Sequence, residues 1–451
     1  MQDLTTGSLS RHLLKTTSMM LVGMTLQTLY VLVDLYWVGH LGTAAVTAAG
    51  IGGNVAFIVL AASQALGVGT TSLIAQAAGR KDRDEATHVY GQSQLLAFVV
   101  GAVFYVVATA LRDNYVNQLA ADAETSALAH DFLMWFIPAM ALQFPLVSMG
   151  SALRGTGRFG PGMWVQGVAV VLNMILSPVF MFGWGPAAPM GIAGAALGTF
   201  VSVAVGTLAM ACYFLPREAY LRFAAVRWKL DLSRWRAILK IGIPAGAEFA
   251  FLSLYIVVVY SVTRPFGAAA QAGFGIGMRI LQSGFLPVVA LGFAVGPVAG
   301  QNFGAGKIDR VRATFYDAAR MAAGAMVLFG LVAHFAPEPL LRPFTSDPGV
   351  IATGTDYLRI TSWSFALSGV IFVTSSLFQA IGNSVPPLIA SASRTMLMVV
   401  LLVFLADADG FKLKWIWWLS VLTIVLQLGL NLSFLKREYR GRLALPPSGT
   451  A

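Results

Sequence analysis

The chain has 451 residues, of which 57% are hydrophobic and only 11% are charged, and its mean hydropathy is +0.73. Soluble globular proteins carry about a quarter charged residues, so this composition excludes that class and indicates a polytopic membrane protein. The formal net charge is +10 and there is one cysteine, Cys212. A single cysteine excludes an internal disulfide, and its place in an apolar run argues against redox chemistry.

Twelve apolar stretches are long enough to cross a bilayer as α-helices. They lie near residues 13–38, 46–72, 90–112, 131–153, 161–183, 191–215, 238–264, 273–298, 315–336, 357–380, 387–406 and 414–435. The first stretch is too long for a signal peptide and lacks a small-residue cleavage site, so we expect it to be retained. The sequence therefore predicts an all-α polytopic membrane protein with twelve transmembrane helices.

Lys and Arg residues concentrate in the loops on one side of these spans. If the N-terminus is cytoplasmic, the cytoplasmic loops hold the basic groups at 80–83, 217–240, 307–312 and 436–442, whereas the opposite loops hold only scattered basic residues. By the positive-inside rule, we expect both termini on the cytoplasmic side of a cytoplasmic (inner) membrane. The net charge then reflects topology, with membrane lipids as partners and no nucleic acid.

The sequence repeats itself after 225 residues. This offset pairs Gly50-Ile51-Gly52 with Gly275-Ile276-Gly277, Gln76 with Gln301 and Pro161 with Pro386. We infer a tandem duplication of a six-helix unit, with an N-terminal lobe at 1–215, a cytoplasmic linker at 216–239 and a C-terminal lobe at 240–451. Because six is even, the two bundles form a parallel internal repeat, and we expect a central cleft between them.

The first predicted span contains a single acid, Asp34, and nothing charged separates it from Lys15. A carboxylate in the hydrocarbon region costs about 2.5–3.5 kcal/mol, so such residues face a bundle interior or a water-filled cavity. Gln27, Tyr30 and Asp34 are spaced by three and four residues and therefore share one stripe of a helix. Asp34 is the first candidate for a functional residue.

Other polar side chains in the same predicted lobe could complete this site. Asn173 and Ser177 lie one turn apart in the fifth span, and Thr199 and Ser202 share a face of the sixth. Together with the first span they could form an oxygen-lined pocket. Buried amides and hydroxyls also hold membrane helices together, each contributing about 0.6–2 kcal/mol. We assign Ser202 to this structural role and leave both interpretations open for Asn173.

The acids are not repeated in the second half. Asp34 aligns with Val259, whereas Glu248, in the seventh span, aligns with Gly23. Arg279 in the eighth span is a candidate counter-ion for Glu248. A structural ion pair and a substrate or proton site are both open interpretations of Glu248.

Enzyme signatures are absent from the sequence. It contains no phosphate-binding G-x-x-x-x-G-K-[ST] motif, and its five histidines are scattered without the spacing of metal ligands. We therefore expect neither an enzyme, nor a metal site, nor a cofactor.

Several stretches resemble the multidrug and toxic compound extrusion (MATE) family of transporters over about residues 10–440. They are LVDLYWVGHLG at 32–42, LIAQAAG at 73–79, ALRGTG at 152–157, Ile243-Pro244 and GQNFGAG at 300–306. The order of these stretches, together with twelve spans in two repeats, carries the resemblance. It implies cation-driven export of organic cations through a cleft between two six-helix lobes. It also implies that the acid of the first helix, Asp34, binds the coupling ion.

The DNA-damage-inducible-like branch resembles this chain most, and there the first lobe also uses the positions of Gln27, Asn173, Ser177 and Thr199. This sequence has Ser177 where that branch usually has an aspartate. With one carboxylate fewer, we expect H⁺ as the coupling ion, with Na⁺ as the alternative. The Na⁺-linked branch carries a second-lobe glutamate in its seventh helix and an aspartate in its tenth. Glu248 lies about one turn early, and residues 363–380 contain no acid.

The sequence thus predicts a monomeric secondary antiporter that exports lipophilic organic cations by alternating access. Asp34 would cycle between protonated and ionised states, and each conformer would bind the proton with a different affinity. We expect Tyr30, Trp37 and Met174 to line the substrate cleft, with Glu248 and Arg279 as further candidates.

Three alternatives remain at the level of the sequence. A lipid-linked oligosaccharide flippase of similar architecture would need several basic residues in its cleft, and only Arg279 and Arg394 qualify. A channel would show repeated rings of polar pore-lining residues, and a non-transporting scaffold has no need for Asp34.

Overall fold

The computed structural model describes residues 1–184, 188–215, 220–221, 229–406 and 410–444. Within these residues every regular element is a helix, and twelve helical segments are long and apolar enough to cross a membrane. The predicted fold class and number of spans are confirmed. The longest helices have 37 residues and extend about 55 Å, well beyond the roughly 30 Å hydrocarbon core.

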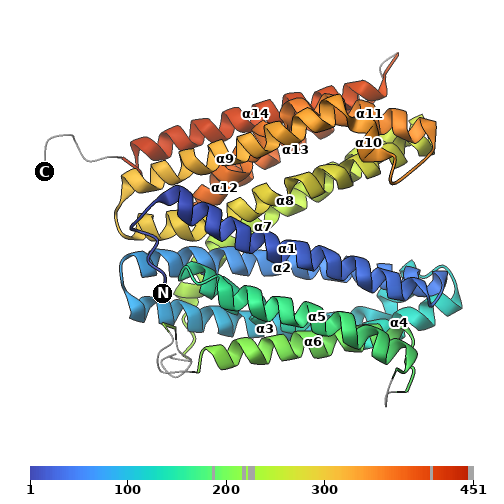
Figure 1. Cartoon of the computed structure of the whole chain (residues 1–451), viewed down its shortest axis with the longest axis horizontal. Coiled ribbons are helices and arrows are strands. Elements are labelled where there is room, and N and C mark those ends of the chain that lie inside the picture. Colours follow the sequence, from blue (N-terminus) through green and yellow to red (C-terminus); the bar gives the residue numbers. More distant parts are fainter. Residues whose placement is uncertain (185–187, 216–219, 222–228, 407–409, 445–451) are drawn as a thin grey trace, which may run out of the picture. The chain divides into compact units, whose positions relative to one another are not determined.

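Figure 1 shows the helices of each half as long rods that run alongside their neighbours. The first half contains α1 (Leu9–Gly39), α2 (Thr43–Gly79), α3 (Arg83–Leu119), α4 (Ala123–Gly155), α5 (Gly160–Phe182) and α6 (Ile192–Tyr213). The second half contains α7 (Leu232–Thr263), α8 (Ala268–Gly304), α9 (Ile308–Phe335), α10 (Pro337–Leu341), α11 (Pro348–Thr361), α12 (Phe365–Ala380), α13 (Val385–Ala406) and α14 (Leu413–Arg440). A 3₁₀ turn at Ser362–Ser364 divides the tenth span into α11 and α12.

The chain forms two compact units whose bounds differ from the predicted lobes. Unit 1 comprises Met1–Asp3 and the described residues of Met19–Ile243, and unit 2 comprises Leu4–Ser18 and the described residues from Pro244 onward. The first part of α1 therefore belongs to unit 2, and the first part of α7 belongs to unit 1. Residues 216–219 and 222–228 of the predicted linker lie outside the described residues.

The start of α7 is fixed to unit 1 by hydrogen bonds with α3. Asp231 precedes α7, and its Oδ1 accepts from the backbone N–H of Ser233 (3.0 Å) and of Arg234 (3.2 Å). Its Oδ2 lies 2.9 Å from His88 Nε2, and Arg234 forms an ion pair of 2.8 Å with Glu85. The contacts with His88 and Ser233 hold the pKa of Asp231 below its usual range. The N-terminal end of α7 thus has a defined polar attachment.

Within unit 2, the segment before α1 is held in a comparable way by α8 and α9. The Leu4 backbone N–H donates to Gln301 Oε1 (3.0 Å), and Asn302 Nδ2 donates to the Leu4 carbonyl (3.2 Å). Lys307 Nζ donates to the Thr5 carbonyl (2.8 Å). Gln301 is the repeat partner of Gln76.

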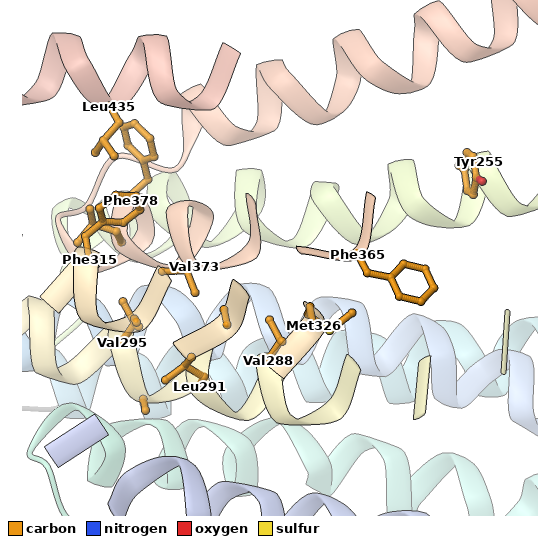
Figure 2. Packing of buried hydrophobic residues seen from close by; sticks show 14 of the residues in the cluster. Tyr255, Val288, Leu291, Val295, Phe315, Met326, Phe365, Val373, Phe378 and Leu435 are labelled. Carbon is orange, nitrogen blue, oxygen red and sulfur yellow. The ribbon is translucent and has the colours of Figure 1, made fainter. Parts of the chain in front are cut away.

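The core of unit 2 is centred on α8, which packs against α9, α11 and α12. Figure 2 shows part of this cluster, in which α12 packs against α8 and α9 and Leu435 of α14 lies beside Phe378 of α12. The labelled members are Tyr255, Val288, Leu291, Val295, Phe315, Met326, Phe365, Val373, Phe378 and Leu435. In unit 1, α4 takes the central place and packs against α2, α3 and α6.

Two glycines allow α5 and α6 to pack closely in unit 1. A Cβ atom on Gly194 would lie 2.5 Å from the carbonyl carbon and oxygen of Phe180, and one on Gly198 would lie 2.9 Å from the backbone nitrogen of Ser177. Small residues four apart are the usual means by which membrane helices approach one another. The spacing Gly194–Gly198 therefore sets the distance between α5 and α6.

We expect Gly194→Ala to lower the free energy of unfolding by about 1–3 kcal/mol, because the added methyl group overlaps the backbone of α5. Gly53→Ala on α2 is the matched control, since a Cβ there meets no atom within 4 Å. Thermal unfolding of the purified proteins in detergent measures both effects. Equal stability of the two variants would contradict the close packing of α5 and α6.

Candidate functional site

A chain of hydrogen bonds in unit 1 links three helices and includes the acid of α1. Ser177 Oγ on α5 lies 3.3 Å from Asp34 Oδ1 and 3.2 Å from Asn173 Oδ1. Asn173 Nδ2 donates to Thr199 Oγ1 on α6 (3.1 Å), and Thr199 donates to the Ala195 carbonyl (3.1 Å). Four of the predicted coupling-site residues are therefore in one connected chain.

Helix geometry explains why these side chains meet. Asn173 and Ser177 are one turn apart and both buried, so they present a continuous polar strip of α5. Gly198 brings α6 against the backbone of Ser177, and the next residue, Thr199, then reaches Asn173. Asp34 is partly buried on α1 and meets this strip at Ser177.

Ser177 is the branch point of this chain because a hydroxyl has one hydrogen. It can donate to Asp34 or to Asn173, and not to both at once. When Asp34 is ionised it accepts only, so it requires the hydrogen of Ser177. When Asp34 is protonated it can donate to Ser177 Oγ, which frees the serine hydrogen for Asn173. The same atoms thus support two hydrogen-bond patterns that differ by one proton on Asp34, and Asn173 Oδ1 receives the hydrogen of Ser177 only when Asp34 is protonated.

Tyr30 lies one turn before Asp34 on α1, and its hydroxyl is close enough to interact with both Asp34 and Thr199. Thr199 uses its own hydrogen on the Ala195 carbonyl, so its oxygen is an acceptor in this chain. Tyr30 therefore places a neutral hydroxyl near the single carboxylate.

The other predicted residues of unit 1 lie outside this chain. Gln27 is exposed and accepts from Gln166 Nε2 (3.1 Å), two turns from Asp34 along α1. Trp37 packs edge-to-face on Phe182 and Trp184, with ring centroids 6.0 Å and 5.6 Å apart.

Met174 is partly buried on α5, next in sequence to Asn173. Ser202, which we expected to hold helices together, has a buried hydroxyl without a hydrogen-bond partner in the described part of the chain.

Glu248 and Arg279 belong to unit 2 and do not form the ion pair considered from the sequence. Glu248 Oε1 instead accepts from Gln379 Nε2 on α12 (3.4 Å), and Ser375 of the same helix lies near it. Arg279 is exposed on α8. The ion-pair expectation is corrected because the carboxylate is turned toward α12 and the arginine is at the surface of the unit.

The described residues contain no group of three or more His, Cys, Asp or Glu side chains that could hold a metal ion. The chain at Asp34 has one carboxylate surrounded by neutral hydroxyl and amide groups. Its arrangement suits the binding of one proton, or of one positive charge, at a time.

Sequence reasoning missed a second polar cluster, in unit 2, made by Arg394, Gln427 and Tyr255. The 225-residue offset could have found it, because Tyr255 is the repeat partner of Tyr30 and Gln427 that of Ser202.

Twelve helices in two repeated units, with a carboxylate inside the first, define a secondary transporter. The MatE family model matches residues 20–179 and 244–405. The chain therefore belongs to the MATE family, and the resemblance noted in the sequence is confirmed. Members of this family are transporters, so the protein is a multi-pass membrane transporter and not an enzyme.

Curated relatives and solved structures agree with this assignment. The chain is 27% identical over 371 residues to the probable multidrug resistance protein NorM of Thermotoga maritima, which covers 81% of this chain and 78% of that protein. It is 24% identical over 411 residues to a FAD transporter of Shewanella oneidensis, with 91% of each covered. Among solved structures, the chain superposes on a MOP superfamily transporter from Pyrococcus furiosus with a TM-score of 0.88 at 23% identity, and 98% of each chain is covered. The reverse polarity of the binding pocket in that structure is described as suggesting a different function. This last likeness concerns the fold.

We expect Ser177→Ala to lower the free energy of unfolding by about 1–2 kcal/mol, because Asp34 and Asn173 lose their shared donor. Ser202→Ala is the matched control. The two serines are 1% and 2% exposed, but the Ser202 hydroxyl has no partner to lose. Unfolding of both purified proteins at one pH measures the difference. If the two variants lose the same stability, Ser177 does not hold the chain together.

Proposed function

We propose that this protein is a proton-coupled antiporter that exports lipophilic organic cations across the cytoplasmic membrane by alternating access. The observation that carries the proposal is the position of Asp34, a lone carboxylate joined to neutral groups through the single hydrogen of Ser177. The kinship with multidrug resistance proteins supports the substrate class. The distribution of basic loops supports cytoplasmic termini.

In the inward-open state, Asp34 is ionised and accepts the hydrogen bond of Ser177. Its negative charge has no counter-ion in the hydrogen-bonded chain, so a lipophilic cation that enters this unit is attracted to it. The attraction is strong because the surroundings are apolar and screen charge poorly. Tyr30, one turn away, offers an aromatic surface to the same cation.

In the outward-open state, a proton from outside binds Asp34 and removes the charge that held the cation. Asp34 then donates to Ser177 Oγ, and Ser177 turns its hydrogen to Asn173 Oδ1. The site stays fully hydrogen-bonded, so protonation does not leave a buried polar atom without a partner. The cation leaves outward, and the proton later leaves toward the cytoplasm.

Antiport follows because proton and cation compete for one carboxylate. Each lowers the affinity for the other, and this coupling is reciprocal at equilibrium. The proton drives export only if it binds one conformer more tightly than the other. Na⁺ is the second candidate ion, since the carboxylate, hydroxyl and amide oxygens of the chain are hard ligands. A single carboxylate supplies little charge for a bare metal ion, which places the proton first.

We expect Asp34→Asn to abolish transport of a fluorescent cation such as ethidium, at least tenfold below the parent. Transport is measured in proteoliposomes with an acidic lumen, where outward proton flow drives dye uptake. Asp113→Asn is the matched control, because that carboxylate is 72% exposed at the end of α3. Both variants must elute as the parent does in size-exclusion chromatography and unfold at a similar temperature.

The same proteoliposomes also receive a Na⁺ gradient at equal pH on both sides. Uptake driven by Na⁺ alone, or an Asp34→Asn protein that performs as the parent does, would contradict proton coupling at Asp34. If neither gradient drives dye transport, the proposed export of cations is contradicted.

A further inference from the structure

Unit 2 has its own polar cluster, on the helices that correspond to those of the Asp34 site. Helices α7, α13 and α14 are the repeat partners of α1, α5 and α6. Under the 225-residue offset, Tyr255 on α7 is the partner of Tyr30, and Gln427 on α14 is the partner of Ser202. Arg394 lies on α13 and faces both. Arg394 itself aligns with Ala169, so this base is particular to unit 2.

The guanidinium group of Arg394 is held in a defined orientation. Its Cζ lies 5.0 Å from the ring centroid of Tyr255, and its Nη1 donates to Gln427 Oε1 (3.3 Å). Gln427 is fixed in turn, because its Nε2 donates to Ser391 Oγ (2.9 Å). The Tyr255 hydroxyl is 2.9 Å from Ser420 Oγ. Three helices therefore position one cation over the ring of Tyr255 and by a hydrogen bond from one of its nitrogens.

Arg394 has no acidic partner within the described residues. It forms no ion pair, and its Nε is buried without a hydrogen-bond partner. Helix α13 contains no acid, and the one acid of α14, Glu438, is bonded to Asn383 near the helix end. The acid of α7, Glu248, lies two turns from Tyr255 and bonds to Gln379.

An unpaired cation inside a membrane bundle is costly, and such groups mark sites of function. The orientation of Arg394 also indicates the ligand. With Nη1 engaged by Gln427, the free edge of the guanidinium is the Nε–Nη2 fork, which matches two oxygens of a carboxylate or phosphate. A bound oxyanion would satisfy both the charge and the unpartnered Nε.

We propose that Arg394, with Tyr255 and Gln427, forms a binding site for the carboxylate or phosphate group of a transported molecule. Unit 2 then extends the substrates from lipophilic cations to organic anions and zwitterions. The site is independent of proton coupling at Asp34, since it lies in the other compact unit and uses none of its residues.

A purely structural arginine is the competing explanation, because stacking on Tyr255 and bonding to Gln427 also join α7, α13 and α14. The two explanations differ in the effect that a carboxylate introduced beside Arg394 has on the binding of anions. Gln427→Glu keeps the shape of the side chain and places a carboxylate beside Arg394, where the structure has the amide oxygen at 3.3 Å. If the site binds oxyanions, this carboxylate occupies it permanently.

The test compares three probes that share a benzene ring, namely phenyl phosphate, benzoate and the neutral benzamide. Binding to the purified full-length protein is measured by calorimetry, and uptake of labelled phenyl phosphate is measured in proteoliposomes. We expect the parent to bind one or both anions at least tenfold more tightly than benzamide. A preference for phenyl phosphate or for benzoate identifies which oxyanion the site takes.

We expect Gln427→Glu to unfold at a higher temperature than the parent and to weaken anion binding at least tenfold. Arg394→Gln should weaken it as much, and Arg394→Lys should weaken it less, because lysine keeps the charge but loses the fork. Asp34→Asn should bind the anions as the parent does while failing to transport ethidium, which separates this site from proton coupling. Equal binding of benzamide and the anions, or anion binding unchanged in Gln427→Glu, would overturn the proposal.

Discussion

The constraint on which this molecule depends is that the bilayer core supplies no water to a polar or charged group. Backbone groups in the spans are therefore satisfied chiefly by helical hydrogen bonds, and a polar side chain in a span is costly unless it finds a partner in the protein. Under this constraint a charged side chain inside a unit requires an explanation. Asp34, Glu248 and Arg394 each lie on a long apolar helix, and each is met by a neutral amide or hydroxyl and by no opposite charge. Such groups cost stability, so their presence is an argument for function.

The Asp34 site shows how close packing and chemistry are connected. Gly194 and Gly198 let α6 approach α5, and this approach places Thr199 beside Asn173 and completes the chain that ends at Ser177. A single serine hydrogen then distinguishes the two protonation states of the carboxylate. Because the chain lies between packed helices, no bulk water is at hand to replace a hydrogen bond that this hydroxyl gives up. Protonation of Asp34 changes which helix, α1 or α5, receives the bond.

The sequence predicts well whatever depends on local properties. All twelve spans were predictable because hydrophobic length is read along the chain, and Asp34, Asn173, Ser177 and Thr199 stand out as polar residues in apolar runs. Gln27 is on the same face of α1 as Asp34, which is what the residue spacing predicts. The spacing also separates the two residues by two turns, about 10 Å along the helix, so their side chains do not meet. Arg279 failed as the partner of Glu248 because a partner depends on side-chain orientation. The division of α1 and α7 between the two units is a matter of non-local contacts, which no window of sequence contains.

The duplication explains how the two units came to carry opposite charges. Their helices align at a fixed offset, and Tyr30 and Tyr255 still occupy equivalent positions. Each unit has an extensive apolar core around its central helix, α4 or α8, that does not involve the charged residue of its polar cluster. The residues of the cluster were thus free to diverge while the scaffold was kept. A carboxylate in one copy and a guanidinium in the other give a single chain two sites of opposite charge preference, which a transporter of one charge class would not require.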